Sequence, residues 1–547
     1  MKKIRLIVFS FLVMIGMPIV VSGVDYSVEY NELWSKQYGP VFDELVSIET
    51  TADGGYILAG VESPTSATTT SSGWLLKVDA SGNEIWSKTY NYSGRDLLYS
   101  VIPTKDGGYI ASGYESEPLG TGTGYTSGWL LKVDANGNEL WSKSYGTEFS
   151  DYLTDIKEIS GGGYIVSGEV RGTLAGETNF GGTDGWLLKI DADGNEIWSK
   201  QYGTSDSEEL NGITITADGS YIAAGMVVVS NGTTINSGGW ALKVDANGNQ
   251  IWSKQFDTTG TGCLEKIIKT SDNYFVIAGY SGDIFNDGSY NGGLEDGWIL
   301  KLDSDGNEIW SKPFGTSASD SLLDIQEAND GNYIASGSTQ GTTTNGVLIG
   351  SNDGWVLKVD PDGNELWSSQ YGETNYNILY SITQSKDGGY AAAGFSYDSN
   401  STGWIIKLEG ELEYQVSFDA NGGKGAMDSI SLKRNTTITL PANAFTNDGH
   451  EFVGWATSKS DADSWTPSDI KVSNVTLITN GGEYTHTVTE DISLYAVWKQ
   501  LNSGDGDNDG DSNGGKLPDT GNSIMNFAVM LMGLVALLAL LTRKKIV

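Results

Sequence analysis

Apart from carboxylates, few side chains in this sequence could carry out chemistry. Cys263 is the single cysteine, and the two histidines, His450 and His486, lie toward the C-terminal end. The long central part holds only Arg95 and Arg171, too few for an arginine cluster that binds a carboxylate. We therefore expect no His-based acid–base mechanism in that part. Carboxylate pairs stay open, because acids are numerous and the sequence does not say which of them converge.

Charge and composition exclude several classes of protein. The chain has 70 acidic and 33 basic residues, which gives a formal net charge of −37. Nucleic-acid binding needs clustered Lys and Arg, so we expect no nucleic-acid partner. The lone cysteine excludes an intrachain disulfide, and the histidines have neither cysteine partners nor metal-ligand spacing. We expect neither a metal nor a cofactor.

The C-terminal segment, residues 517–547, contains a short polar motif, an apolar run and a basic tail in that order. The motif consists of Leu517, Pro518, Asp519, Thr520 and Gly521. The apolar run covers 525–541, about 26 Å as a helix, at the short end of what spans a bilayer. The basic residues at 543–545 would stay in the cytoplasm by the positive-inside rule. Together these features resemble the LPXTG sorting signal of Gram-positive surface proteins.

This resemblance implies a covalent route to the cell wall. A sortase thiol would attack the Thr520 carbonyl, the segment from Gly521 onward would leave, and the amine of a peptidoglycan precursor would resolve the thioester. The chain is then the substrate of a sortase and meets the membrane only through the cleaved C-terminal helix. The alternative is a plain single-pass membrane anchor.

Two further segments are predicted to lie outside the folded body. Residues 1–23 have a basic start, an apolar run, and small residues at Val21 and Gly23, the pattern of a secretory signal peptide. A retained membrane anchor is the alternative. Residues 500–516 are a Gly/Asp-rich spacer. The acids at 505–509 mimic the start of a calcium loop, but Lys516 stands where its bidentate Glu belongs.

Three aromatic markers recur seven times each along the central part, at a period near 55 residues. The tryptophan of "GW" occurs at Trp74, Trp129, Trp186, Trp240, Trp298, Trp355 and Trp404. The tryptophan of "WSK" or its variants occurs at Trp34, Trp86, Trp141, Trp198, Trp252, Trp310 and Trp367. The tyrosine of "GGY" or its variants occurs at Tyr56, Tyr109, Tyr164, Tyr221, Tyr274, Tyr333 and Tyr390.

Each repeat divides into four short strands, of which the third and fourth flank a "DADGN"-type turn. A loop that short makes these two strands antiparallel neighbours. The central part begins with a lone fourth strand at 31–38 and ends with three strands, so the first strand can complete the last sheet and remove an open edge. We predict an all-β fold in which residues 28–410 form a closed seven-bladed β-propeller. A linear solenoid is the alternative.

The repeated aromatic residues and the irregular loops receive different interpretations. We expect the seven "GW" tryptophans to pack between neighbouring blades. The "D-x-x-G-N" acids are interpreted as turn residues, with calcium binding as the alternative. Insertions between the second and third strands lie at 61–72, 114–127, 169–184, 280–296 and 338–353. They would crowd one face, which is the predicted binding surface. The candidate ligand-binding residues on it are Tyr125, Phe180, Phe285 and Tyr290.

Two family resemblances rest on quoted residues. The repeat "GGYIVSG…DGWLLKIDADGNEIWSKQYG" resembles propeller repeats of secreted bacterial and archaeal surface proteins, and is more distantly similar to the pyrroloquinoline-quinone dehydrogenase repeat. Residues 411–499 carry "FDANGG" at 418–423, Phe452, "GW" at 454–455 and "LYAVW" at 494–498. This pattern resembles the Listeria–Bacteroides (internalin B-type) repeat, which implies a small β-rich, grasp-like module of surface proteins.

We therefore predict a secreted protein that is covalently anchored to a Gram-positive cell wall and displays a propeller. It would be a monomeric adhesin or ligand-binding protein for a host, matrix or glycan ligand, not an enzyme. The alternative is an extracellular carbohydrate-active propeller enzyme, a glycoside hydrolase or lyase.

Overall fold

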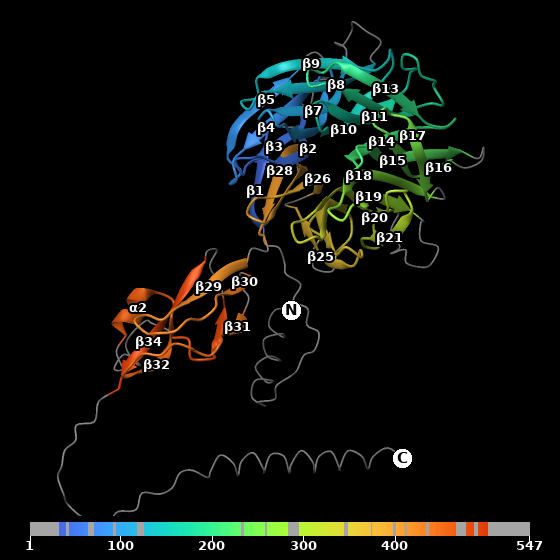
Figure 1. Ribbon diagram of the computed structural model, residues 1–547. Coiled ribbons are helices and arrows are strands. Elements are labelled where there is room, and N and C mark those ends of the chain that lie inside the picture. The colour runs from blue at the N-terminus through green and yellow to red at the C-terminus, as the bar shows by residue number, and fades with distance from the viewer. Residues whose placement is uncertain are drawn as a thin grey trace, which may run out of the picture. The chain divides into compact units, whose positions relative to one another are not determined.

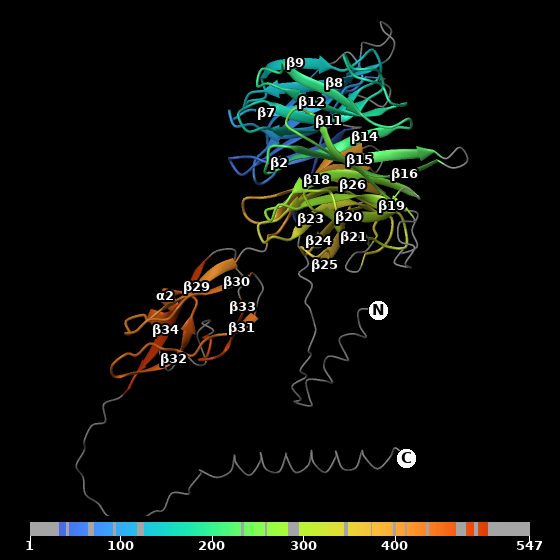
Figure 2. The ribbon, with the colours of Figure 1, turned by 45° about the vertical axis from the view of Figure 1, so that its right-hand side comes forward.

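The computed structural model describes residues 32–39, 43–63, 70–90, 94–116, 125–230, 235–257, 260–282, 295–343, 348–372, 375–397, 401–410, 413–433, 437–465, 477–485 and 491–501. The chain divides into two compact units at Glu413/Tyr414. The described part of the first unit is all-β and consists of seven four-stranded antiparallel sheets (Figures 1 and 2). The predicted repetition of four-stranded sheets is therefore confirmed.

Six of these sheets run in sequence order from an innermost to an outermost strand. The first sheet contains β2 (Glu44–Thr50), β3 (Tyr56–Glu62), β4 (Ser72–Val78) and β5 (Glu84–Tyr90). The second contains β6 (Leu97–Pro103), β7 (Tyr109–Ser116), β8 (Thr126–Val133) and β9 (Glu139–Tyr145). The third contains β10 (Tyr152–Glu158), β11 (Tyr164–Val170), β12 (Asp184–Ile190) and β13 (Glu196–Tyr202). The fourth contains β14 (Glu208–Ile215), β15 (Tyr221–Ser230), β16 (Ile235–Val244) and β17 (Gln250–Phe256).

The remaining sheets continue the pattern, and the seventh takes its outermost strand from the start of the chain. The fifth contains β18 (Thr261–Lys269), β19 (Phe275–Gly282), β20 (Asp296–Leu302) and β21 (Glu308–Phe314). The sixth contains β22 (Asp320–Glu327), β23 (Tyr333–Thr339), β24 (Asp353–Val359) and β25 (Glu365–Tyr371). The seventh contains β26 (Tyr376–Gln384), β27 (Tyr390–Tyr397), β28 (Ser401–Leu408) and β1 (Glu32–Tyr38), with β1 antiparallel to β28. Each innermost strand contacts the innermost strand of the next sheet, and β26 contacts β2.

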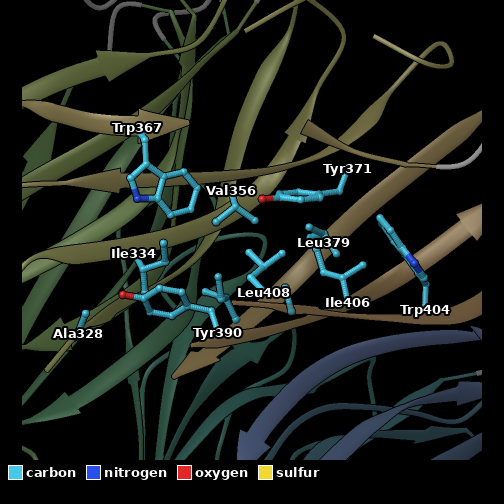
Figure 3. Packing of buried hydrophobic residues seen from close by; sticks show 12 residues of the cluster. Ala328, Ile334, Val356, Trp367, Tyr371, Leu379, Tyr390, Trp404, Ile406 and Leu408 are labelled. Atoms are coloured by element: carbon cyan, nitrogen blue, oxygen red, sulfur yellow. The ribbon is translucent and has the colours of Figure 1, made fainter. Parts of the chain in front are cut away.

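The glycine of each "GW" pair makes room for the tryptophan of the next sheet. A Cβ at Gly128 would lie 2.8 Å from the Trp186 ring, and the same contact joins Gly403 to Trp74, between the seventh and first sheets. The indole Nε1 of Trp186 donates a 2.8 Å hydrogen bond to Ser199 Oγ of the adjacent strand. All seven "GW" tryptophans are buried. One apolar core between two sheets, which includes Trp404, is drawn in Figure 3.

The outermost strands of six sheets each hold the "D-x-x-G-N" turn of the next sheet. Asp79 Oδ1 accepts hydrogen bonds from the backbone N–H of Ser81 and Asn83, and Gly82 has a φ of 72°, which favours glycine. Lys36 Nζ donates a hydrogen bond to the Ser81 carbonyl at 2.7 Å, and the hydroxyl of Tyr38, in the same strand, donates one to the Gly82 carbonyl at 2.5 Å. These acids are therefore engaged in turns, as the favoured interpretation expected.

Two departures from the repeat have structural reasons. The outermost strands β1, β5, β9, β13, β17 and β21 each carry a lysine two residues after the "WSK" tryptophan, whereas β25 carries Ser369 at that position. The turn that such a lysine would contact is absent, because β28 is followed by Glu409 and Gly410 rather than by a "D-x-x-G-N" turn. In the fifth sheet, the tyrosine marker was assigned wrongly. Phe275, not Tyr274, occupies the marker's register position, because Phe275 pairs with Leu302 as Tyr56 pairs with Val78.

The second unit contains a mixed sheet and a short helix. The sheet order is β30 (Ile430–Lys433), β29 (Glu413–Asp419), β34 (Ile492–Gln500) and β32 (His450–Ala456), with β29 parallel to β34. A second ladder joins β31 (Thr437–Thr439) to β33 (Glu483–Thr485), and α2 spans Lys459–Ser464. Trp455 is fully buried, with its ring centroid 5.0 Å from that of Phe418 and 5.0 Å from that of Phe452. The motif residues of the predicted repeat thus meet in one core.

Several sequence predictions lie outside the described residues: the signal peptide 1–23, nearly all of the spacer 500–516, and the sorting signal 517–547 with its apolar run. Among the residues that the structure does describe, no helix has the length and apolar character needed to cross a membrane.

Candidate functional site: a central cavity

Every innermost strand contains a β-bulge at the same place. The register of β2 on β3 skips one residue between Leu45 and Ser47, and the other six innermost strands do the same at the equivalent position. A bulge leaves the extra residue unpaired and re-aims its side chain. The seven inner bulge residues are Val46, Tyr99, Thr154, Asn211, Glu265, Leu323 and Tyr380.

All seven inner bulge residues line one cavity of about 600 Å³, here called the central cavity. The rest of its lining comes from neighbouring positions: Ser47, Ser100, Tyr114, Tyr152, Glu169, Arg171, Glu209, Lys266, Asp324 and Ser381. Tyr114 and Glu169 stand near the ends of second strands, and Arg171 lies in the loop that follows. The cavity therefore reaches the strand ends from which the predicted binding loops leave.

A belt of polar side chains, of which Lys266, Asp324 and Ser381 also line the cavity, ties the innermost strands together. Asp155 Oδ1 accepts from Lys157 Nζ and Lys266 Nζ, both at 3.0 Å. Asp324 Oδ2 accepts from Ser381 Oγ at 2.7 Å, and Ser381 Oγ accepts from the Ile48 N–H at 3.3 Å. The belt thus links strands across the junction of the seventh and first sheets.

Charges inside this belt compensate one another in part. Burial opposes ionisation of Asp155, but the two ammonium groups hold its pKa well below the ordinary value. Burial also opposes the charge on Lys266, yet the carboxylates of Asp155 and Asp324 raise its pKa. Burial still raises the pKa of Asp324 and lowers the pKa of Lys157, so the compensation is incomplete.

Three glutamates converge in the cavity toward its loop-bearing end. Glu169 and Glu209 share a hydrogen bond, and Glu265 interacts with Glu209 electrostatically. Burial, followed by repulsion from Glu209, raises the pKa of Glu169 and of Glu265 to about 7. Burial alone raises the pKa of Glu209. Carboxyl groups that exchange protons near neutral pH are therefore gathered at one place.

Tyrosine rings stand beside these carboxyl groups. The ring centroids of Tyr114 and Tyr152 lie 5.0 Å apart in an edge-to-face arrangement, and those of Tyr99 and Tyr114 lie 5.8 Å apart. Tyr380 joins them as the inner bulge residue of the seventh sheet. The cavity combines aromatic faces with polar groups, as small-molecule sites commonly do.

The residues chosen from the sequence lie elsewhere. Tyr125 and Phe180 are exposed, at 41% and 46%, and neither is among the residues that line the cavity. The Tyr125 ring lies 5.5 Å from that of Phe149. Phe285, Tyr290 and the sorting motif fall outside the described residues. Cys263 is buried, with its Sγ 3.2 Å from Asn211 Nδ2.

The cavity residues were missed because no single repeat looks unusual. A signal does exist in the sequence: each innermost strand places two residues between a buried leucine and a buried isoleucine or valine. Those pairs are Val46-Ser47, Tyr99-Ser100, Thr154-Asp155, Asn211-Gly212, Glu265-Lys266, Leu323-Asp324 and Tyr380-Ser381. The flanking apolar residues barely change from repeat to repeat, whereas the pairs change freely.

Two family models match parts of the chain. Residues 414–480 match the Listeria-Bacteroides repeat domain, which confirms that resemblance for this segment. Residues 126–340 match the model described as outer membrane protein assembly factor BamB, which supports the propeller-type repeat.

Matches to individual proteins are distant. The regulatory protein FlaEY of Caulobacter vibrioides is 20% identical over 461 residues, 72% of this chain and 48% of that protein. The chain thus spans about half the length of this curated relative.

The solved structures are similarly remote. Sqt1 from Chaetomium thermophilum has a TM-score of 0.41 at 9% identity, covering 70% of this chain and 99% of that one. The extracellular domain of a putative hybrid two-component system from B. thetaiotaomicron has a TM-score of 0.39 at 12% identity, covering 71% and 45%.

Proposed function

We propose that this chain is a wall-anchored surface display protein whose first unit, a closed seven-bladed propeller, binds a ligand through the loop-bearing end of the central cavity. The observation that carries the binding role is the cavity itself, because seven bulges bring aliphatic, aromatic, polar and acidic side chains into one space. The scaffold around it is repetitive, whereas its lining is not. Recognition on a rigid scaffold calls for that combination.

The display role rests on the order of the chain's segments. The predicted signal peptide, the propeller unit, the Listeria–Bacteroides repeat domain, the Gly/Asp spacer and the LPDTG motif follow one another as a surface protein requires. A Thr520→Ala variant expressed in a Gram-positive host with a sortase tests this role. The wild-type chain should be released only by a muramidase, and the variant should be extracted by detergent. Detergent extraction of both would overturn wall anchoring.

Ligand binding is tested on residues 24–516 with arrays of glycans and matrix proteins. A cavity variant, Tyr152→Ala, should lose any specific signal, while the loop variant Tyr125→Ala reports on the exposed residues chosen from the sequence. Far-UV circular dichroism checks that both variants are folded. Loss of the signal in Tyr125→Ala alone would move the binding surface from the cavity to the loops.

An extracellular carbohydrate-active enzyme is the second candidate. The specific observation that favours it is the gathering of Glu169, Glu209 and Glu265, all with raised pKa values, in one cavity. General acid–base catalysis on a glycosidic bond uses two carboxyl groups with different protonation states. Reducing-end release from an array ligand, abolished in Glu209→Gln, would support the enzyme, and binding without turnover would support the display protein.

A further inference from the structure

The chemistry of the central cavity narrows the ligand class, on the premise of the proposed binding function. We propose that the group that enters the cavity is an alkylammonium cation, held between the tyrosine rings and the carboxyl groups of Glu169, Glu209 and Glu265. Its source would be an amine-bearing small molecule, with the amine carbon chain against the aromatic walls.

The tyrosines provide the geometry for a cation. Tyr99, Tyr114 and Tyr152 come from β6, β7 and β10, three strands of two neighbouring sheets. The Tyr114 ring centroid lies 5.8 Å from that of Tyr99 and 5.0 Å from that of Tyr152. Tyr380 extends this aromatic wall from the seventh sheet. Aromatic faces attract ammonium groups through the ring quadrupole, and the attraction strengthens where water is excluded.

The charges of the lining favour a cation over an anion. Three carboxyl groups line the loop-bearing part of the cavity, and the two cationic side chains of the lining are Arg171 and Lys266. Lys266 is already bound by Asp155 at 3.0 Å. Arg171 is exposed in the loop after β11. When Glu169, Glu209 and Glu265 are ionised, the positive charge beside them is therefore too small to balance their negative charge.

The proton affinity of the cavity agrees with this arrangement. Burial and the neighbouring Glu209 raise the pKa of Glu169 and Glu265 to about 7, so protons occupy these groups below neutral pH. An entering ammonium would displace those protons, and its affinity would therefore rise with pH from 6 to 8. The other titratable or charged groups near these carboxyls are Glu44, Asp151, Cys263, Tyr280, Arg171 and the cavity tyrosines.

A coordinated metal ion is a poorer fit than an organic cation. Across the part of the chain that the structure describes, no group of three or more His, Cys, Asp or Glu side chains is arranged to hold a metal. A neutral polyol could hydrogen-bond to the same carboxyl groups, but its affinity would change little with their protonation. The pH dependence therefore separates these two ligand classes.

Calorimetric titration of the full chain in detergent with 1,4-diaminobutane tests the inference. Its neutral isostere 1,4-butanediol is the matched ligand control. The diamine should bind at pH 8 and about tenfold more weakly at pH 6, because two carboxyls titrate in that interval. The diol should show no binding at either pH.

Cavity variants assign the binding to named groups. Glu209→Gln should weaken the diamine at least about tenfold at pH 8, while Glu139→Gln, on the exposed outermost strand of the second sheet, should leave it unchanged. Tyr114→Phe keeps the ring and should keep the affinity, whereas Tyr114→Leu should weaken it. Thermal unfolding confirms that each variant is folded.

The outcomes separate the two proposals. Equal affinity for diamine and diol, no binding of either, or full affinity in Glu209→Gln would overturn the cation inference. If an array ligand is lost in Tyr152→Ala while the diamine fails to bind, the binding function stands and only the ligand class is wrong. If the cavity variants affect neither the array ligand nor the diamine, both proposals fall.

Discussion

The innermost and outermost strands of each sheet both carry a β-bulge, and the two rings of bulge residues differ in chemistry. The outer bulge residues are all leucine or isoleucine: Leu33, Ile85, Leu140, Ile197, Ile251, Ile309 and Leu366. They are exposed by 45–57%. The inner bulge residues include aliphatic, aromatic, polar and acidic side chains and converge on one cavity.

This difference teaches where function can reside in a repeated fold. Seven equivalent positions with one chemistry give seven equivalent surfaces, which scarcely distinguish one ligand from another. Seven equivalent positions with different chemistries, pointed at a common space, give a single asymmetric site. The repeat markers supply the scaffold, and the variable pairs of the innermost strands supply the candidate specificity.

The largest expected effect comes from breaking the scaffold. Trp186→Ala removes a fully buried indole that packs on Gly128 of the preceding sheet and bonds to Ser199. We expect a loss of about 3–5 kcal/mol in the free energy of unfolding, because a cavity replaces the ring. Denaturant unfolding followed by far-UV circular dichroism measures it. The half-buried Trp198, in the adjacent strand, is the control, and an equal loss in Trp198→Ala would contradict the assigned roles.

The sequence was sufficient for the scaffold and insufficient for the cavity, for a physical reason. The "GW" pair and the "D-x-x-G-N" turn are local requirements, so each repeat states them again. Glu169, Glu209 and Glu265 lie in three different sheets and meet only after the sheets pack. A bulge also breaks the two-residue alternation from which side-chain direction is normally predicted, so the residue that lines the cavity cannot be identified by periodicity.

A smaller effect, a gain rather than a loss in the free energy of unfolding, is expected when the cavity residue Glu265 is replaced. Burial and Glu209 raise the pKa of Glu265 from its ordinary value to about 7, so its contribution to stability is present below about pH 4.5 and is lost as the pH rises toward 7. Glu265→Gln should therefore raise the free energy of unfolding at pH 8 by about 1–2 kcal/mol, and change it little at pH 4. Thermal melts at both pH values measure this difference. Glu196→Gln, at an exposed position, is the control, and stabilisation at pH 4 but not at pH 8 would refute the sign.

The contact between an outermost strand and the "D-x-x-G-N" turn of the next sheet offers a matched pair of variants with a modest effect. Lys143 Nζ donates to the Asp193 carbonyl at 2.7 Å and to Asn195 Oδ1 at 3.1 Å. Lys143→Ala should cost about 0.5–1 kcal/mol, because these bonds are solvent-exposed. Ser369→Lys, which restores the repeat's lysine where no "D-x-x-G-N" turn follows β28, should give no stabilisation. A gain in Ser369→Lys equal to the loss in Lys143→Ala would show that the lysine acts without the turn.

The smallest effect should come from the outer bulge residues, and it tests whether repetition alone indicates importance. Ile197 is 55% exposed, so Ile197→Ser removes little buried apolar area and should change the free energy of unfolding by less than about 0.5 kcal/mol. Array binding should also be unchanged, since the residue lies in the outermost strand while the cavity is lined from the innermost strands. A loss above about 2 kcal/mol, or altered binding, would mean that the uniform outer ring has a role of its own. The contrast between the two rings would then reflect two functions rather than scaffold and site.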